Sequence, residues 1–331
     1  MAPRLTTPMH LPRGIFTVSL DFELVWGSRD LYQADLRPLL QAAQVTRAQV
    51  FGPLLGMLQD FGIVATWATV GNLFLERNAR VDGRLYPGLT APNHAWHPDW
   101  YAGIPEGTEA THPEYYGRSL VLALRDAGQE VGSHSFSHPV FGDPGCSRET
   151  ADSELARCVR EAAELGISLR SFVFPRNVAG HVDLLKKHGF RCWRGLEPVW
   201  YRNARVPGPV SRIAHLADVA TIGHPPTVLP YQDAHGLWVI PASTSFLPYE
   251  GIRRAIPMYN RVKRATRCTE HAAKHRRISH FWLHPINLAA EPKVLLDGMR
   301  KVLGHAARLR DAGKLDILPM GEIAAQAAER C

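Results

Sequence analysis

The sequence predicts an α/β protein that folds as a (β/α) barrel, and three observations support this prediction. Short β-rich apolar runs alternate along the chain with longer segments of helical periodicity. Many of these runs are continuously apolar, which is typical of buried parallel strands. Their number approaches the eight βα units of a barrel. A chain of 331 residues also supplies enough core for one large α/β domain.

The elements follow from this alternation in chain order. Eight apolar runs predict strands, and they span residues 15–22, 63–70, 130–134, 169–174, 190–194, 237–241, 279–283 and 315–318. Six segments of helical periodicity predict helices, and they span residues 37–61, 113–127, 147–165, 182–188, 292–312 and 321–329. Most of the helices follow a strand, as the crossover helices of parallel sheets do.

Two long proline-rich stretches, 78–112 and 196–236, interrupt this alternation. Structureless loops of this length are uncommon in compact domains unless they have a function. In a barrel, the loops that follow strands lie at the rim where substrates bind. We therefore predict two substrate-facing insertions in a single catalytic domain over residues 1–331. Residues 1–13, with three prolines, are predicted to be a flexible N-terminal segment.

Composition points to a cytoplasmic globular protein. Hydrophobic residues make up 45% of the chain and charged residues 21%, and no apolar run reaches the ~18 residues that span a bilayer. The five cysteines form no close-spaced pair, which fits reduced thiols better than a disulfide framework. The first 13 residues lack an apolar stretch of signal-peptide length.

The net charge of +7 is concentrated in one segment, which begins with Arg253 and ends with Arg277. One interpretation is a solvated helix face. The other is a peripheral contact with phosphate groups or an anionic membrane. Nucleic acid is not expected as a partner, because no recognition motif or interleaved aromatic pattern is present. The sequence carries no signal for an oligomeric state.

The chain is rich in histidine, so its histidine pairs must exceed chance to be informative. Three pairs have the i, i+4 spacing, where chance gives about 0.8. His271 and His275 lie among arginines and lysines that repel a cation. His280 and His284 lie along a predicted strand, where four residues span roughly 13 Å. Only the remaining pair, His134 and His138, is flanked by serine, glycine and proline that could bring both rings to one point.

Two carboxylates, Asp21 and Glu23, end the first predicted strand. Residues i and i+2 of a strand share a face, so both carboxylates can point into the mouth of the barrel. Imidazoles together with a carboxylate suit a divalent ion such as zinc, and a spare carboxylate suits a general base. Ion pairing at the strand end is the alternative. The combination with the histidine pair predicts metal-assisted hydrolysis.

Four motifs in this order resemble those of the polysaccharide deacetylases, the NodB-like group of carbohydrate esterase family four. They span most of the chain, and they are Asp21-Phe22-Glu23, His134-Ser135-Phe136-Ser137-His138-Pro139, Phe174-Pro175-Arg176-Asn177 and Trp282-Leu283-His284-Pro285. The resemblance implies a distorted (β/α)7-8 barrel with long rim loops. It also implies removal of acetyl groups from N-acetylated sugars by a metal and an acid/base pair.

The resemblance implies a role for each matching residue. Glu23, His134 and His138 would bind a divalent metal, zinc first, with cobalt, nickel or manganese as alternatives. Asp21 would be the catalytic base and His284 the acid. Arg176 would resemble the arginine that pairs with the base.

Two departures from the family pattern affect these roles. Many family members have adjacent aspartates in the first motif, whereas Phe22 separates the acids here, so which of Asp21 and Glu23 binds the metal stays open. Arg176 follows its proline, whereas the family's arginine precedes it. Five residues are candidates for substrate binding, with tryptophans as stacking platforms for sugar rings: Trp26, Trp96, Trp100, Asn177 and Trp200.

The leading functional hypothesis is a hydrolase of C–N bonds other than peptide bonds. It would release acetate from an N-acetylated amino sugar that is free, nucleotide-linked, lipid-linked or part of an oligosaccharide. The alternative is a metal-independent or non-sugar amide or ureide hydrolase on the same barrel. A carbohydrate-binding relic is a third hypothesis, which the retention of both a base and an acid disfavours.

Overall fold

The structure is a computed structural model that describes residues 11–202, 206, 208–220 and 225–330. Within these residues, ten strands form one sheet in the order β10-β11-β1-β2-β5-β6-β7-β9-β8, with β12 beside the first residues of β1. All neighbours in the sheet are parallel except β8 and β9. The strands are β1 (Gly14–Phe22), β2 (Thr66–Thr69), β5 (Glu130–Ser133), β6 (Ser171–Phe172), β7 (Cys192–Gly195), β8 (Tyr231–Gln232), β9 (Trp238–Pro241), β10 (Thr244–Ser245), β11 (Ile278–Leu283) and β12 (Leu315–Ile317).

One continuous segment joins the two ends of this curled sheet. Strand β9 pairs with β7, and the Ala242 amide then donates to the Gly195 carbonyl at 2.9 Å. The next amide, that of Ser243, donates to the His280 carbonyl at 2.9 Å, and β10 pairs with β11. The chain therefore crosses from one end of the sheet to the other between β9 and β10. The predicted distorted (β/α) barrel is confirmed, and each of the eight predicted strands has a counterpart.

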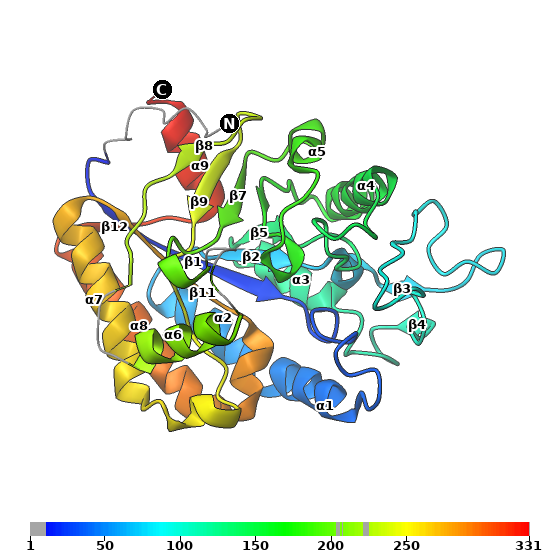
Figure 1. Ribbon diagram of the computed structural model, residues 1–331, viewed down its shortest axis with the longest axis horizontal. Helices are drawn as coiled ribbons and strands as arrows, with labels where there is room; N and C mark the ends of the chain where they lie inside the picture. The colour runs from blue at the N-terminus through cyan, green and yellow to red at the C-terminus, as the bar shows by residue number, and fades with distance from the viewer. Residues whose placement is uncertain (1–10, 203–205, 207, 221–224, 331) are drawn as a thin grey trace.

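Strand β1 lies at the centre of the barrel wall (Figure 1), and all nine of its residues are buried. Its first residues pair with β12 and its last residues with β2, while β11 runs along its other side. Aromatic rings pack behind its end, where Phe22 meets Trp67 edge to face at 5.4 Å and Phe51 at 5.6 Å between ring centroids. The end of β1 is thus fixed from several sides.

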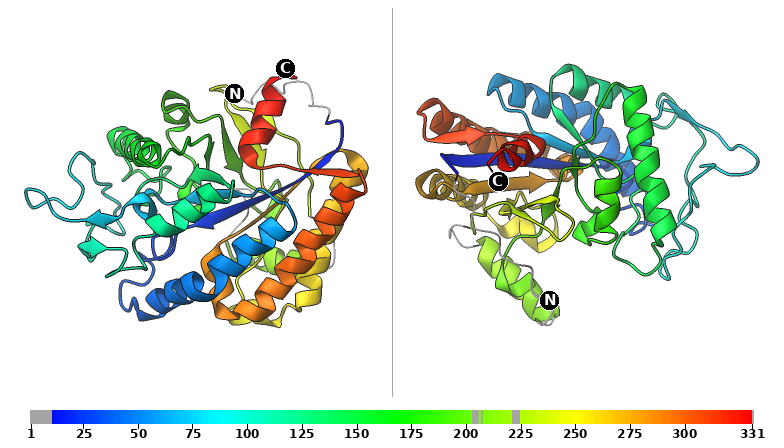
Figure 2. Two further views of the ribbon diagram at one scale, coloured as in Figure 1. Left: turned by 180° about the vertical axis from the view of Figure 1, so that it is seen from behind. Right: turned by 90° about the horizontal axis from the view of Figure 1, so that it is seen from above.

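Helices surround the sheet (Figures 1 and 2). The predicted helix 37–61 is a run of α1, a π-helical turn η1 and α2. Helix α6 was not predicted, and α7 corresponds to the segment from Arg253 to Arg277, for which a helix face was one interpretation. The α-helices are α1 (Arg37–Val45), α2 (Gly52–Asp60), α3 (Arg118–Asp126), α4 (Arg148–Glu164), α5 (Val182–Lys187), α6 (Gly208–Ala220), α7 (Met258–His275), α8 (Pro292–Asp311) and α9 (Met320–Ala328). The other helical turns are η1 (Thr46–Phe51), η2 (Gly71–Phe74), η3 (Pro175–Asn177), η4 (Trp200–Arg202), η5 (Gly251–Ala255) and η6 (Pro285–Ala290).

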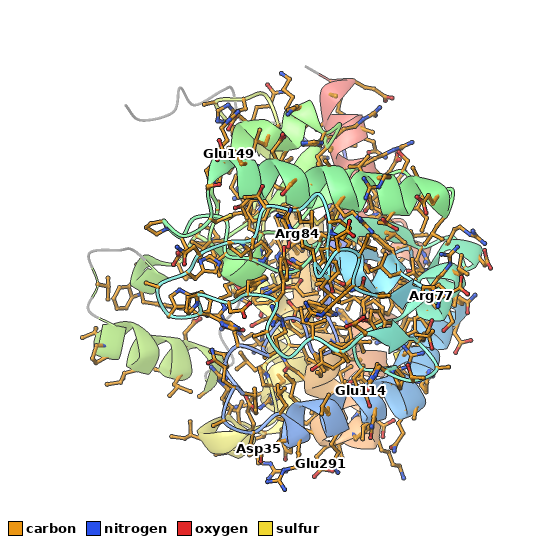
Figure 3. All side chains as sticks on the ribbon, turned by 90° about the vertical axis from the view of Figure 1, so that its right-hand side faces the viewer. Asp35, Arg77, Arg84, Glu114, Glu149 and Glu291 are labelled. Atoms are coloured by element: carbon orange, nitrogen blue, oxygen red, sulfur yellow. The ribbon has the colours of Figure 1, made fainter. Side chains whose placement is uncertain are left out.

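The predicted rim insertions follow strand ends, but they contain more regular structure than expected. The stretch 78–112 overlaps a two-stranded hairpin of β3 (Arg77–Asn78) and β4 (Gly107–Thr108). The stretch 196–236 includes helix α6 and strand β8, while its residues 203–205, 207 and 221–224 lie outside the described residues. Figure 3 views the molecule from the right-hand side of Figure 1, with Arg77 and Arg84 on the face toward the viewer.

The predicted flexible N-terminal segment is only partly described, because residues 1–10 lie outside the described part of the chain. Of the remaining three residues, Leu11 is buried and packs in a cluster that includes Ile15 and Met320. Arg13 forms an ion pair with Asp316 at 3.1 Å. Leu11 and Arg13 thus contact the body of the barrel, while the flexibility of the segment stays a prediction.

The basic segment between Arg253 and Arg277 presents less charge at the surface than its sequence implies. Arg261 and Arg264 on α7 are buried, and Arg261 donates to backbone carbonyls, including that of Leu247 at 2.6 Å. Arg264 pairs with Asp218 at 2.6 Å. None of the helices in the described part of the chain combines the length and apolar character that a bilayer crossing requires.

Substitution of two glycines, one in the turn after β2 and one on α2 as a control, tests how tightly that turn packs against α4. An added Cβ at Gly71 would lie 2.7 Å from both Cys158 Sγ and Phe136 Cδ2 and 2.9 Å from Phe136 Cα, whereas one at Gly56 on α2 meets nothing within 4 Å. We expect Gly71→Ala to lower the free energy of unfolding by about 1–3 kcal/mol through overpacking. Gly56→Ala should be neutral or raise it by up to ~1 kcal/mol. Urea unfolding measures both, and equal effects would contradict the packing described.

Candidate metal centre

The predicted site residues meet at the carboxyl ends of the parallel strands. Asp21 lies in β1 and Glu23 directly after it, His134 follows β5, and His284 follows β11. Because the ends of parallel strands share one edge, these side chains lie close together despite their separation in sequence. Leu24, at φ +48°, turns the chain away from the site directly after Glu23.

Glu23, His134 and His138 form a buried cluster. The Nε2 atom of His134 lies 2.8 Å from Glu23 Oε1, and the Nε2 atom of His138 lies 3.2 Å from the same oxygen. One ligand atom from each of the three side chains can be chosen so that all lie within 4.8 Å of one another. Asp21, Glu23 and His284 form a second, overlapping group by the same measure. The structure thus brings together all five acids and imidazoles that the sequence predicts.

The loop between the two histidines has an unusual backbone that aims both rings at Glu23. Ser135 and His138 adopt left-handed conformations, at φ +61° and +66°, and the two imidazole rings lie 4.9 Å apart. Left-handed non-glycine residues are uncommon and need support from their surroundings. The Ser135 hydroxyl supplies part of that support by accepting from the His138 amide at 3.0 Å.

Glu154 on α4 holds the same loop from below. Its Oε2 accepts from the amides of Phe136 and Ser137 at 2.9 and 2.7 Å, and the Ser137 hydroxyl donates to its Oε1 at 2.6 Å. The side chain is fully buried, and this burial raises the pKa of Glu154 to about 7. Sequence reasoning missed this residue, because a glutamate within a helix carries no signal of what it contacts.

The donor set fits a divalent metal. The ring of His134 donates from Nδ1 to the Val173 carbonyl at 2.7 Å, which leaves Nε2 to face Glu23. The Nε2 atom of His138 is buried, and its one close polar neighbour among the described residues is Glu23 Oε1, in a poor hydrogen-bond geometry. Burial lowers the pKa of His138, so its ring is neutral near pH 7 and offers a lone pair. One carboxylate and two imidazoles are a common protein ligand set for zinc that keeps positions open.

Gly27 makes room for the carboxylate of Glu23. A Cβ at residue 27 would lie 1.7 Å from Glu23 Oε2, so no other amino acid fits here without moving the ligand. The loop after β1 therefore packs its backbone directly against the candidate metal site.

Arg194 on β7, and not Arg176, pairs with the predicted base. The Nη1 and Nη2 atoms of Arg194 donate to Asp21 Oδ1 and Oδ2 at 2.5 and 2.6 Å, and both side chains are buried. Burial opposes ionisation of Asp21, but Arg194 together with His284 outweighs it and lowers the pKa of Asp21. The signal that could have identified Arg194 is a charged residue at the carboxyl end of a predicted strand, the edge where the site residues of a barrel gather.

The prediction for Arg176 is wrong because its backbone directs it elsewhere. Arg176 and Asn177 both adopt left-handed conformations, at φ +53° and +56°, in the turn after β6. The guanidinium of Arg176 pairs with Asp30, and it lies 5.0 Å from the ring centroid of Trp96. It therefore links the loop after β1 to the 78–112 insertion instead of reaching Asp21.

A buried network orients Arg194. Its Nη1 donates to Ser19 Oγ at 3.0 Å, and its Nη2 donates to Asn177 Oδ1 at 3.1 Å. The Nε2 atom of His280 lies 2.9 Å from Ser19 Oγ, and burial lowers the pKa of His280 to about 3, so this ring stays neutral. Asn177, predicted to bind substrate, thus contacts the partner of the base in this structure.

His284 lies between the buried cluster and the mouth of the barrel. Its Nε2 is 3.5 Å from Asp21 Oδ2 and 3.7 Å from Glu23 Oε1. Its side chain is 29% exposed, which is more than that of any other predicted site acid or imidazole. The position suits a group that meets a substrate on one side and the buried carboxylates on the other.

The predicted tryptophan platforms divide into two groups. Trp26 and Trp100 are fully buried and donate from Nε1 to the carbonyls of Tyr115 and Ser137, so the prediction that they stack against sugars is wrong. The insertions fold back over these rings instead of leaving them at the rim. Trp96 is 41% exposed and Trp200 is 67% exposed, so both remain accessible. The ring of Trp96 also stacks on His94 at 4.8 Å.

These features define a distorted (β/α) barrel with a buried Glu/His/His cluster at its mouth. Comparison of the sequence with family models gives no match, and neither does comparison with curated proteins. The structure is nevertheless similar to solved structures over nearly its whole length.

Three of these similar structures share the fold at low sequence identity. A protein described as a polysaccharide deacetylase from Mycobacterium smegmatis has a TM-score of 0.64 at 16% identity, covering 98% of this chain and 94% of its own. One described as a polysaccharide deacetylase from Pseudomonas aeruginosa PAO1 has a TM-score of 0.62 at 10% identity, and the match covers 95% of this chain and 91% of that protein. Puue allantoinase has a TM-score of 0.61 at 12% identity, and the match covers 97% of this chain and 93% of the allantoinase.

A pair of substitutions at Glu154 tests its role in holding the metal-site loop. Glu154→Ala removes the acceptor of two buried amides, and each amide left without a partner costs about 1–3 kcal/mol. Glu154→Gln keeps an acceptor for the amides and offers its NH₂ group to the Ser137 hydroxyl. We expect the alanine variant to lose stability and zinc affinity and the glutamine variant to keep both, as measured by urea unfolding and zinc titration.

The raised pKa of Glu154 also predicts a pH dependence of stability. A carboxyl whose pKa rises from 4.5 to about 7 on folding stabilises the fold fully below pH 4.5 and loses that contribution as pH rises through 7. Wild-type stability should therefore fall relative to that of Glu154→Gln between pH 5.5 and 8. A constant difference between the two proteins would show that Glu154 does not titrate in this range.

Proposed function

We propose that this protein is a metal-dependent hydrolase that removes the acetyl group from an N-acetylated amino sugar. The observation that carries the proposal is the convergence of Glu23, His134 and His138 on one buried point, with Asp21 and His284 beside it. The fold shared with proteins described as polysaccharide deacetylases supports a hydrolase acting on C–N bonds. The sugar specificity rests on the four sequence motifs.

In the proposed mechanism, Glu23, His134 and His138 hold a divalent ion, with zinc first among the candidates and cobalt, nickel or manganese as alternatives. Such an ion, when bound, polarises the acetyl carbonyl and lowers the pKa of a bound water. The Glu23 carboxylate and the neutral His138 ring supply oxygen and nitrogen donors, and the Val173 carbonyl fixes the orientation of His134.

Asp21 and His284 divide the proton transfers between them. Arg194 keeps Asp21 ionised and fixes both of its oxygens, so Asp21 can take a proton from the attacking water. His284 faces the mouth and donates a proton to the departing nitrogen, which is otherwise a poor leaving group. Because its Nε2 lies 3.5 Å from Asp21 Oδ2, the base and the acid can serve the same reacting centre.

Further parts of the proposal come from the sequence. Residues 1–331 form one catalytic domain that acts in the cytoplasm, so the substrate is a soluble, nucleotide-linked or lipid-linked sugar or a short oligosaccharide. Trp96 and Trp200, which are exposed, remain candidates for sugar contacts. The segment from Arg253 to Arg277 remains a candidate contact for phosphate groups or an anionic membrane, and nucleic acid is not a proposed partner.

The second candidate function is hydrolysis of a non-sugar amide or ureide on the same barrel. The observation that favours it is the fold shared with Puue allantoinase. The buried Glu/His/His cluster favours the metal-dependent mechanism, since two imidazoles and a carboxylate that face one buried point suit a metal ion. Metal analysis of the purified protein and an acetate assay distinguish the two.

Substitution of the candidate ligands tests the metal-dependent mechanism. We expect His134→Ala and His138→Ala to lose bound zinc and to reduce acetate release from an N-acetylated amino sugar by at least 10²-fold. This reduction corresponds to the ~3 kcal/mol by which one group typically stabilises a transition state. Chelation of the wild type should have the same effect, and added zinc should reverse it. The control is His235→Ala, because His235 lies in an exposed turn. Full activity in either ligand variant would overturn the mechanism.

A comparison of two arginines tests the assignment of the partner of the base. Arg194→Lys keeps the charge but loses the paired hydrogen bonds to Asp21, so we expect kcat to fall by about 10–100-fold. Arg176→Lys disturbs only the contact with Asp30 and Trp96 and should have a smaller effect on kcat. Zinc content should stay unchanged in both variants. The reverse order of the two effects would restore the original prediction for Arg176.

A further inference from the structure

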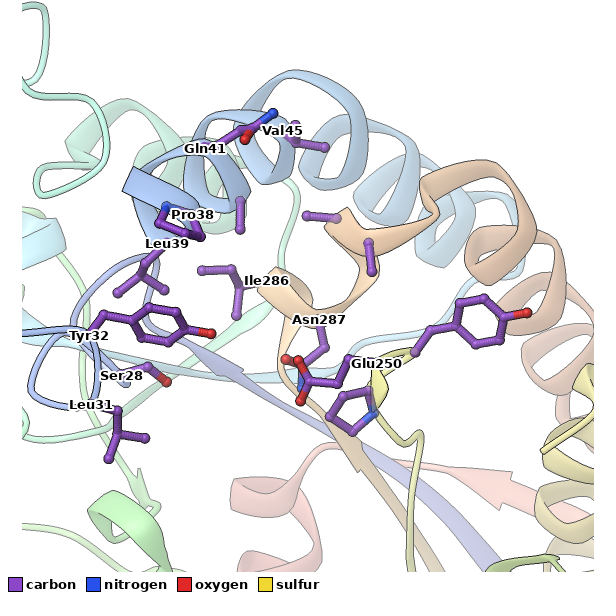
Figure 4. Close-up of a pocket in the computed structure, with 15 residues that line it drawn as sticks. Ser28, Leu31, Tyr32, Pro38, Leu39, Gln41, Val45, Glu250, Ile286 and Asn287 are labelled. Carbon is purple, nitrogen blue, oxygen red and sulfur yellow. The ribbon is translucent and has the colours of Figure 1, made fainter. Parts of the chain in front are cut away.

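A cavity of about 400 Å³ is lined in part by residues that closely follow Glu23 and His284 in the chain (Figure 4). Four segments line it, namely the loop after β1, helix α1, the loop after β10 and the turn η6. Three of these segments follow strands on the side of the barrel where the site lies. The cavity does not include the Glu/His/His cluster itself, so it is a separate space next to it.

Two walls of the cavity continue directly from the catalytic groups. Ser28 in one wall follows Gly27, whose backbone touches the carboxylate of Glu23. In the opposite wall, the backbone N–H of Asn287 donates to the backbone carbonyl of His284 at 3.0 Å. The cavity is therefore close to both Glu23 and His284, the group proposed to protonate the departing nitrogen.

The chemistry of the lining selects for an uncharged and largely apolar group. Most of the lining side chains are aliphatic, aromatic or proline, and Figure 4 shows Tyr32, Leu39 and Ile286 around one end of the space. Neither lysine nor arginine lines the cavity among the described residues, whereas Glu250 does. Glu250 lies 3.8 Å from Arg253, an ion pair that partly neutralises this carboxylate. Leu31 at the opening is 67% exposed, which is unusual unless an apolar ligand covers it.

We propose that this cavity binds an uncharged, apolar aglycone joined to the N-acetylated sugar, so that the protein acts on apolar glycosides. The inference rests on the proposed deacetylase function and adds a substrate class to it. Among the carriers that the sequence leaves open, the mostly apolar side chains of the lining favour an apolar one.

The test compares methyl and octyl glycosides of N-acetylglucosamine, using the full chain loaded with zinc. We expect kcat/KM for the octyl glycoside to exceed that for the methyl glycoside by at least tenfold, about 1.4 kcal/mol. Ala42→Phe places a large side chain in the cavity from α1 and should reduce this ratio to about one. The matched control is Ala163→Phe on the exposed face of α4, which should leave the ratio and the activity unchanged.

The outcomes distinguish failure of this inference from failure of the proposed function. If the methyl glycoside is hydrolysed but the octyl chain brings no advantage, or if Ala42→Phe keeps that advantage, the cavity is not an aglycone site and the deacetylase function stands. If no glycoside is hydrolysed, calorimetry with the same two glycosides decides the inference. Tenfold tighter binding of the octyl glycoside that Ala42→Phe abolishes would support it, and equal affinities would overturn it.

Discussion

The buried carboxylate of Glu23 is the constraint on which the rest of the site depends. Removing a carboxylate from water is costly unless charges or hydrogen bonds compensate for it. Burial raises the pKa of Glu23, but His284 and His134 outweigh this effect and hold that pKa well below its usual range. Since His138 also faces the same oxygen atom at 3.2 Å, the cluster presents three donor side chains to one point. A bound cation would complete the compensation.

The surrounding structure contributes several features that make sense only if this point must be held in place. Gly27 leaves space for the carboxylate, and Glu154 ties down a loop in which Ser135 and His138 have left-handed backbones. A second buried carboxylate, that of Asp21, receives its own fixed partner in Arg194. The barrel therefore keeps two carboxylates in separate environments, one facing imidazoles and the other a guanidinium. Such a separation is how a site assigns different roles to similar groups.

The sequence predicts those parts of the site that local geometry determines. Asp21 and Glu23 share a strand face by simple alternation, and His134 and His138 are joined by a turn, so both pairs are readable from spacing. Arg194 was missed because its pairing with Asp21 depends on two strands that lie on different sides of the barrel. The burial of Trp26 and Trp100 depends on how the long insertions fold, and residue types do not determine that. Helix α6 was missed because prolines and glycines surround it in the sequence.

The most direct test of the account is the position of zinc in the crystallised, zinc-loaded protein, located by anomalous diffraction at the zinc absorption edge. The account predicts one strong peak bounded by Glu23 Oε1, His134 Nε2 and His138 Nε2, with Asp21 still paired to Arg194. A peak held by other residues, or the absence of a peak at this cluster while the protein hydrolyses its substrate, would contradict it.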